Sequence, residues 1–363
     1  MKMNNIRKLG DYIREVDVRN ENLEVKKLLG VNLSKQLFPS IANIVGTDLS
    51  KYKIIKKDQF GCKFMSVGRD GILPIALMEY NDPAIFSSAY HVFEVKDADI
   101  LLPRYLMMWF KRSEFDRQLW FYSGGDVRGG VTYKDFCEMP INIPSIEQQQ
   151  KIVSEYEAVT HRIRLNEQII AKLEETAQAL YRKMFVDGID KENLPEGWRM
   201  GTIGEMFELQ RGFDLPSQNR VIGQFPIYAS TGITGYNNQF KVTPPCVVTG
   251  RSGSIGEVFY INEKCWPLNT TLWVKDFKDT PPLFVYYKLK EVELGKTIAG
   301  FAAVPTLNRN DVHIMNTIVP SKIIMEQFHK FANKLYNHKQ SISKENKVLQ
   351  KLQSLLLAKM ERI

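Results

Sequence analysis

The sequence predicts an α+β fold: two mixed α/β domains separated by two long helices that form an antiparallel coiled coil with pseudo-two-fold symmetry. Two observations support it. An apolar pattern with helical spacing occurs twice at one constant offset, and each copy follows a block of short β-rich runs and turns. The predicted ranges are 1–144 for the first domain, 145–186 for the first helix, 187–320 for the second domain and 321–363 for the second helix.

The first domain combines strand and helix signals. The runs 52–55 and 90–95 are rich in β-branched and aromatic residues and lie between turn residues. The stretch 103–110 is apolar and begins with a proline, which is favoured at the first position of a helix. These signals predict a mixed domain.

The first long helix begins after Pro144, where Ser145 can cap the exposed backbone amides, and Asp187-Gly188 is a plausible stop beyond Phe185. Its apolar positions are separated by alternating steps of four and three, which is typical of a coiled-coil seam. The seam residues are Ile152, Tyr156, Val159, Ile163, Asn166, Ile170, Leu173, Ala177, Leu180 and Met184.

The second half of the chain repeats this arrangement. A linker at 190–198 leads into a second block, and a Glu-Gln pair recurs at Glu326 as at Glu147 (326 − 147 = 179). The same offset transfers the seam to Phe331, Leu335, His338, Ile342, Glu345, Leu349, Leu352, Leu356, Lys359 and Ile363. Antiparallel packing then predicts that Ile152 lies near Ile363, and Met184 near Phe331.

Polar residues interrupt the predicted seam. Asn166 and Glu345 occupy equivalent positions, and His338 and Lys359 are also polar. Such residues can specify the register of the helices, or they can face a partner or solvent. A helix of this length, about 58 Å at roughly 1.5 Å per residue, exceeds one duplex turn of about 34 Å, although it is also compatible with a purely structural coiled coil.

Composition narrows the class of protein. The net charge of +8 and the pI of about 9.1 favour an anionic partner such as nucleic acid, although many soluble proteins are mildly basic. No run of about 18 apolar residues and no signal peptide is evident, which predicts a cytoplasmic protein without a membrane partner. The four cysteines are scattered, so neither a zinc site nor a disulfide framework is expected.

Motifs for catalysis are missing. The sequence has no G-x-G-x-x-G and no Walker phosphate loop. The glycine-rich segment 250–256 is followed by a strand-like run, so it does not predict a serine nucleophile elbow at Ser254. We therefore expect a chain that is not an enzyme and holds no metal or cofactor.

Arginines in glycine-rich loops are the candidates for nucleic-acid binding. Glycine allows close approach of the backbone, and arginine suits phosphates and guanine edges. With neighbouring hydroxyl, amide and lysine groups, the predicted DNA-binding set is Arg69, Arg128, Tyr133, Lys134, Arg211, Thr231, Arg251, Ser252, Asn308 and Arg309. The alternative is that these loops are β-turns with solvated side chains.

Several short sequence motifs resemble those of one protein family. They are Thr-Gly-Ile-Thr-Gly-Tyr at 231–236, the glycine-rich run at 250–256, Cys-Trp-Pro-Leu-Asn-Thr-Thr at 265–271, Leu-Pro-Glu-Gly-Trp at 194–198, and, in the first half, 67–71, 86–90 and 146–149. Together they cover essentially the whole chain, which resembles the specificity subunit of a type I restriction-modification enzyme.

The resemblance implies two target recognition domains, each reading one half of a bipartite, asymmetric sequence in double-stranded DNA. The conserved helices would act as a spacer and as the docking surface for two methyltransferase (modification) subunits, which restriction subunits join. S-adenosylmethionine and ATP would bind those partners. Two alternatives remain: the specificity chain of a related type II system that cuts at a distance, and a coiled-coil adaptor without a role on DNA.

Overall fold

A computed structural model describes residues 7–42, 44, 46–122, 131–294 and 306–360. The chain forms two compact units: unit 1 comprises Met1–Leu165 and Glu345–Ile363, and unit 2 comprises Asn166–Lys344. The division passes through both long helices, α5 (Ile146–Phe185) and α10 (Lys322–Lys359). The units differ from the predicted domains because each helix contributes side chains to the cores of both.

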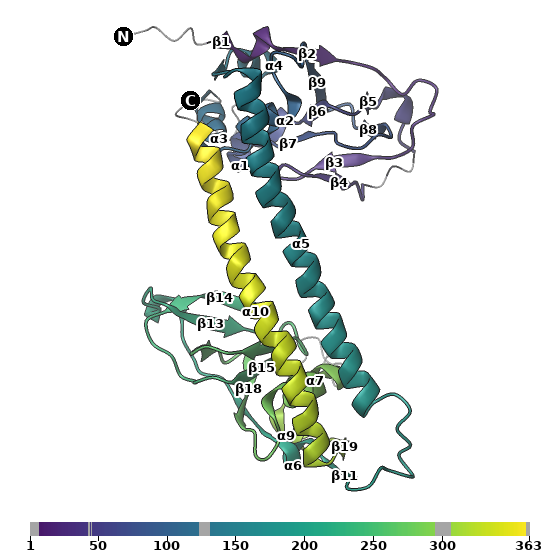
Figure 1. Ribbon diagram of the computed structural model, residues 1–363, viewed down its shortest axis with the longest axis vertical. Helices are drawn as coiled ribbons and strands as arrows, with labels where there is room; N and C mark the ends of the chain where they lie inside the picture. Colours follow the sequence, from purple (N-terminus) through teal and green to yellow (C-terminus); the bar gives the residue numbers. More distant parts are fainter. Residues whose placement is uncertain (1–6, 43, 45, 123–130, 295–305, 361–363) are drawn as a thin grey trace. The chain divides into compact units, whose positions relative to one another are not determined.

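Unit 1 contains a four-stranded antiparallel sheet in the order β2-β9-β6-β7 (Figure 1). Its strands are β2 (Ile13–Val16), β9 (His91–Val95), β6 (Gln59–Cys62) and β7 (Ile75–Leu77). Two-stranded pairs join β1 (Arg7–Lys8) to β10 (Pro140–Ile141), β3 (Leu29–Val31) to β4 (Leu37–Pro39), and β5 (Lys53–Ile55) to β8 (Ala84–Phe86). The helices are α1 (Val67–Asp70), α2 (Pro103–Phe110), α3 (Ser113–Tyr122) and α4 (Tyr133–Cys137).

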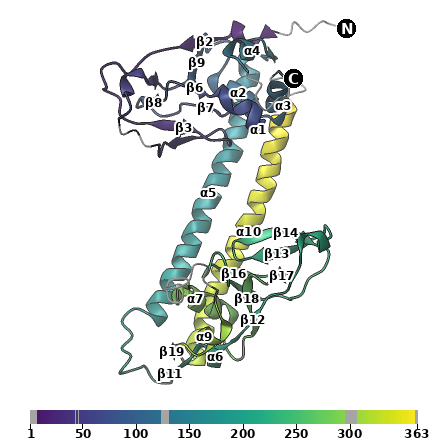
Figure 2. The same cartoon turned by 180° about the vertical axis from the view of Figure 1, so that it is seen from behind.

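Unit 2 contains a four-stranded antiparallel sheet in the order β12-β18-β15-β16, of which Figure 2 labels β12, β18 and β16. Its strands are β12 (Glu208–Arg211), β18 (Thr271–Asp276), β15 (Cys246–Gly250) and β16 (Val258–Ile261). A second sheet orders β14 (Gly232–Asn237), β13 (Phe225–Ala229) and β17 (Trp266–Pro267), and β11 (Arg199–Thr202) pairs with β19 (Asn316–Val319). The helices are α6 (Ile203–Met206), α7 (Pro282–Glu291) and α9 (Arg309–His313).

The duplication extends into the globular parts. In both units the four strands of the main sheet, numbered in chain order, are arranged first, fourth, second, third. Helix α7 begins at Pro282 and α2 at Pro103, which is again a separation of 179 residues (282 − 103 = 179). The blocks therefore share an α+β topology although their sequences match only at isolated points.

Within each unit, α5 and α10 run in opposite directions. In unit 1, Thr160 accepts a hydrogen bond from Gln353 (2.8 Å), and Arg162 pairs with Glu345 (2.9 Å). Unit 2 has an ion pair between Glu174 and Lys339, and the rings of Tyr181 and Phe328 are 5.5 Å apart. In both units, higher residue numbers on α5 meet lower numbers on α10.

Burial corrects part of the predicted seam. The ten seam positions of α5 are buried or partly buried, and Asn166 is only 1% exposed. On α10, Leu335, Ile342, Leu349 and Leu356 are also buried or partly buried. The prediction was wrong for Phe331 and Leu352, which are 57% and 42% exposed. His338 and Lys359 are exposed, which agrees with the alternative that these polar positions face solvent or a partner. Ile363 lies outside the described residues, so the predicted proximity of Ile152 and Ile363 stays a prediction, and so does that of Met184 and Phe331.

The second row of α10 is displaced by one residue from the prediction. Its inward positions are Ala332, Lys339, Asn346, Gln353 and Met360, all buried or partly buried. These residues are mostly small or polar, and the offset of 179 residues from α5 placed the predicted seam on their neighbours instead. Lys339 and Gln353 can occupy the inward row because Glu174 and Thr160 on α5 satisfy their polar groups.

Candidate nucleic-acid interface

Four residues of the predicted set converge on one groove in unit 2, which we call the arginine groove. Arg211, Arg251, Asn308 and Arg309 line this cavity of about 660 Å³. The remaining lining residues are Gln210, Gly212, Phe213, Asp214, Leu272 and Thr306. The groove therefore joins the ends of β12 and β15, the beginning of β18, and the segment that enters α9.

Backbone hydrogen bonds hold the segments of the groove together. The amide of Arg251 donates to the carbonyl of Thr270 (2.8 Å), and the carbonyl of Arg251 accepts from the amide of Leu307 (2.8 Å). Asn308 caps α9, because its side chain accepts from the amide of Asn310 (3.0 Å). Arg309 is the first residue of that helix, so its backbone position is fixed by the cap.

His313 links α9 to the strand that carries Arg211. Its Nε2 accepts a hydrogen bond from the amide of Leu209 on β12 (2.8 Å). Burial lowers the pKa of His313, and the positive charge of Arg309 lowers it further. The neutral imidazole thus fixes β12 against α9 beneath the groove.

The charges in the arginine groove are unbalanced. Arg211 pairs with Asp214 at 3.3 Å. Among the residues that the structure describes, neither Arg251 nor Arg309 forms an ion pair. Three guanidinium groups therefore face one carboxylate, which makes the groove suitable for phosphates and for the acceptor atoms of guanine.

Thr231 and Ser252 lie outside the groove lining but near it. Thr231 is exposed in the turn between β13 and β14, and a Cβ atom on Gly253 would lie 3.4 Å from the hydroxyl of the adjacent Ser230. Ser252 pairs through its backbone with Thr306, which lines the groove. Both residues therefore sit on segments that flank the arginines.

The candidates in unit 1 are more dispersed. Arg69 lies on α1 and forms a two-point ion pair with Asp70 (2.9 and 2.8 Å), which offsets its charge. Lys134 is exposed on α4. Arg128 lies outside the described residues.

Tyr133 is partly buried and packs against the core of unit 1. Its ring stacks on His91, with centroids 5.5 Å apart and planes 6° apart, and it also contacts Phe64 and Phe136. Its hydroxyl is buried, and burial raises its pKa. The short helix α4 directs the hydroxyl of Tyr133 inward, so this group is not available to DNA. A contact between the partly exposed ring and DNA stays a prediction.

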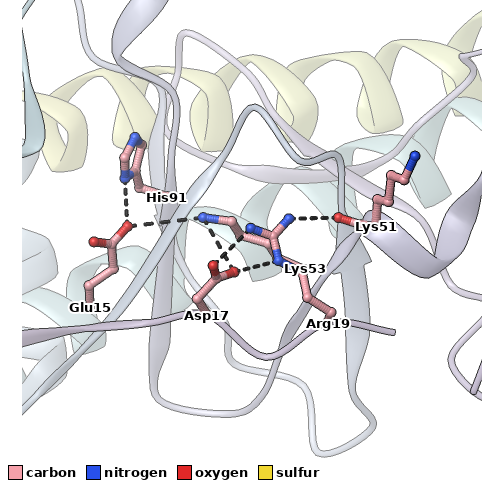
Figure 3. Close-up of polar contacts among 6 residues, drawn as sticks. All are labelled: Glu15, Asp17, Arg19, Lys51, Lys53 and His91. Carbon is pink, nitrogen blue, oxygen red and sulfur yellow. Dashed lines mark hydrogen bonds and ion pairs between the residues drawn. The ribbon is translucent and has the colours of Figure 1, made fainter. Parts of the chain in front are cut away.

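Unit 1 contains a charged cluster that was not predicted from the sequence (Figure 3). Glu15 accepts from His91 at 2.8 Å, and Arg19 pairs with Asp17 at 2.7 Å. The buried Lys53 lies 4.0 Å from Glu15 and 3.7 Å from Asp17. The sequence signal that could have predicted this cluster is the alternation of the charged residues Glu15, Asp17 and Arg19 along β2 and just beyond it.

Other kinds of site find no support in the described part of the chain. No group of three or more His, Cys, Asp or Glu side chains there could hold a metal ion. All four cysteines are free, and burial raises the pKa of Cys62. None of the described helices has the length and apolar character needed to span a membrane.

Comparison with protein families gives a match over most of the chain. Residues 24–175 and 195–353 match a family described as the type I restriction modification DNA specificity domain. The chain is 33% identical over 110 residues to the HindI specificity subunit of Haemophilus influenzae, a match that covers 29% of this chain and 23% of that subunit. It is 22% identical over 299 residues to the MjaIX specificity subunit of Methanocaldococcus jannaschii, covering 72% and 69% respectively.

Solved structures show the same fold. The S subunit of a type I restriction-modification system from M. genitalium superposes with a TM-score of 0.65 at 17% identity, covering 99% of this chain and 98% of that one. A chain from a structure on complex assembly and conformational transition of a type I system has a TM-score of 0.52 at 18% identity, covering 97% and 96%.

Proposed function

The chain belongs to the type I restriction-modification DNA specificity family, and from this premise we propose that it is the non-catalytic subunit that recognises DNA for such a complex. Each unit reads one half of a bipartite, asymmetric target. The subunit acts in the cytoplasm, where the DNA and its partners are found.

The arginine groove is the observation that supports this function most directly. A groove with three guanidinium groups and one carboxylate attracts the anionic backbone of DNA. Gln210 and Asn308 add amide groups, which can pair with base edges. Such a groove provides both affinity and sequence discrimination.

The two units offer different chemistry at the corresponding sheet edge. The edge strand of the main sheet is β12 in unit 2 and β2 in unit 1. Arg211 ends β12, whereas Glu15 lies on β2 with Asp17 just beyond it. The half-sites that the units recognise should therefore differ, which makes the target asymmetric.

We propose that α5 and α10 form an antiparallel coiled coil that spaces the half-sites and binds two methyltransferase subunits, with restriction subunits joining the complex. An apolar stripe on α10 supports the docking role: Val348, Leu352 and Leu355 are 66%, 42% and 66% exposed at helical spacing. S-adenosylmethionine and ATP are assigned to the partners, since the sequence has no motif for either.

The docking role predicts that Leu355→Glu prevents assembly without unfolding the chain. A charge on the stripe opposes burial against a partner helix, whereas an exposed position costs the isolated chain little, within about 0.5 kcal/mol. Co-purification with the methyltransferase subunit measures assembly, and Leu355→Met is the matched control. Normal assembly of Leu355→Glu would contradict the assignment of this surface.

A salt titration tests DNA binding itself. Affinity of the assembled complex for its duplex should fall steeply as salt rises, because each phosphate contact releases counterions. A coiled-coil adaptor would show no duplex binding even with its partner present. The other alternative, the specificity chain of a type II system that cuts at a distance, also binds DNA, and the identity of the partner chain distinguishes it.

A further inference from the structure

An exposed ion pair at the edge of the arginine groove has no evident role in stability. Nη2 of Arg211 lies 3.3 Å from Oδ1 of Asp214, and the two side chains are 53% and 66% exposed. The same carboxylate oxygen accepts a hydrogen bond from the side-chain amide of Asn269. Exposed pairs of this kind contribute little to folding, so the arrangement calls for another explanation.

The backbone beneath this trio is tightly constrained. The amide of Gly212 donates to the carbonyl of Thr271 (3.0 Å), and the amide of Asn269 donates to the carbonyl of Phe213 (3.1 Å). A Cβ atom on Gly212 would lie 2.2 Å from the carbonyl oxygen of Leu268, so only glycine fits there. The segments that carry Arg211, Asp214 and Asn269 are therefore held side by side.

The pairing leaves most of the guanidinium available. A guanidinium carries five N–H donors, and the contact with Asp214 involves Nη2 alone. Holding a long side chain in one orientation in the free protein reduces the entropy lost when it binds. An arginine oriented in this way can donate two hydrogen bonds to O6 and N7 of guanine, the commonest specific contact in the major groove.

We propose that Arg211 specifies a guanine in the half-site of unit 2, and that Asp214 is the positioning residue that orients it. This inference rests on the proposed function of the chain in DNA recognition. Unit 1 differs at the corresponding edge, because Glu15 and Asp17 surround the buried Lys53 there. The guanine requirement therefore belongs to one half-site.

The test uses the complex with its cognate methyltransferase subunit. Methylated sites are mapped for the wild type and for Arg211→Lys, Asp214→Ala and Asp214→Glu. Arg211→Lys and Asp214→Ala should each reduce the preference for one guanine by roughly 5- to 100-fold and leave the other positions unchanged. Asp214→Glu keeps the carboxylate and should retain more of that preference than Asp214→Ala.

A matched control lies on the same strand. Glu208 pairs with Lys275 at 3.3 Å with similar exposure, 40% and 50%, but does not line the groove. Glu208→Ala should leave the recognised sequence unchanged. Binding to a duplex with 7-deazaguanine at the specified position isolates the N7 contact: the wild type should lose affinity, and Arg211→Lys should be insensitive to the replacement.

Three results would overturn the inference: an unaltered consensus in Arg211→Lys, an equal loss at every position in Asp214→Ala, or a wild-type consensus without guanine. The first would show that Arg211 reads no base, and the second would indicate a phosphate contact or general damage. In contrast, a wild-type complex without any sequence preference would contradict the proposed function rather than this assignment.

Discussion

Individual arginines give the groove of unit 2 its charge. Backbone hydrogen bonds to neighbouring segments fix the backbone positions of these arginines. Arg251 is held on both sides of its peptide, by Thr270 and by Leu307. Because no ion pair is described for its guanidinium, DNA can bind this group without first displacing a carboxylate. The binding of DNA to Arg251 is therefore not opposed by the free-energy cost of breaking an ion pair.

Arg251→Ala should therefore weaken recognition of one half-site and leave the other intact. Loss of a base contact costs about 1–3 kcal/mol, whereas loss of a phosphate contact lowers the slope of the salt dependence by about 1. Titrations with duplexes that carry either half-site measure both effects. Arg199→Ala, which removes an exposed pair with Glu205, is the control. Equal losses at both half-sites would contradict independent recognition.

His313 makes unit 2 sensitive to acid. The pKa of His313 is below its ordinary value of 6.5, so its contribution to stability is complete above pH 6.5 and is lost as the pH falls through the lowered pKa. The wild type should lose unfolding free energy below pH 6.5, and His313→Gln should lose less over the same range. Denaturant titrations at a series of pH values test this. Parallel curves would show that protonation of His313 is not linked to folding.

The accessibility of the unit 2 arginines could be predicted because glycine-rich loops seldom bury a charged side chain, whereas their role in binding DNA stays a prediction. The burial of the Tyr133 hydroxyl could not be predicted, since a helix of five residues gives too little periodicity to show which face is buried. Asp214 and Asn269 were also missed. They are 55 residues apart in the sequence, and only the pairing of neighbouring backbone segments brings them together.

At the scale of elements, the long helices were predictable in extent but only partly in register. Alternating steps of three and four fit two neighbouring phases equally well, so residue type must decide between them. On α10 the apolar choice was misleading: Phe331 is exposed, and the smaller Ala332 is 2% exposed in the core of unit 2. Hydrogen bonds to α5 compensate for the polar residues of the inward row.

Substitutions on α10 distinguish the two phases. Ala332→Leu should destabilise the chain by about 1–3 kcal/mol because the added atoms have no space in the core. Phe331→Gln should change stability by no more than about 0.5 kcal/mol, as expected at an exposed position. Equilibrium unfolding in urea measures both. If Phe331→Gln destabilised the chain more than Ala332→Leu, the register predicted from α5 would be correct.

At the scale of the whole molecule, the constant offset of 179 residues was the most informative sequence signal. The same offset separates the two long helices and also separates α2 from α7. The correspondence of α2 and α7 is hidden in the sequence because their side chains differ. The shared strand order could not be predicted, because it depends on pairings between strands distant in the sequence. A duplicated frame with chemically different edges is what recognition of two unlike half-sites requires.

Recognition of two unlike half-sites is tested most directly by a genome-wide map of methylated bases in cells that express this chain with its cognate methyltransferase subunit. We expect one bipartite motif whose two half-sites differ in sequence and are separated by a gap of fixed length. Substitutions in the arginine groove should alter only one of the half-sites. A contiguous motif, two identical half-sites, or methylation without any sequence preference would contradict it.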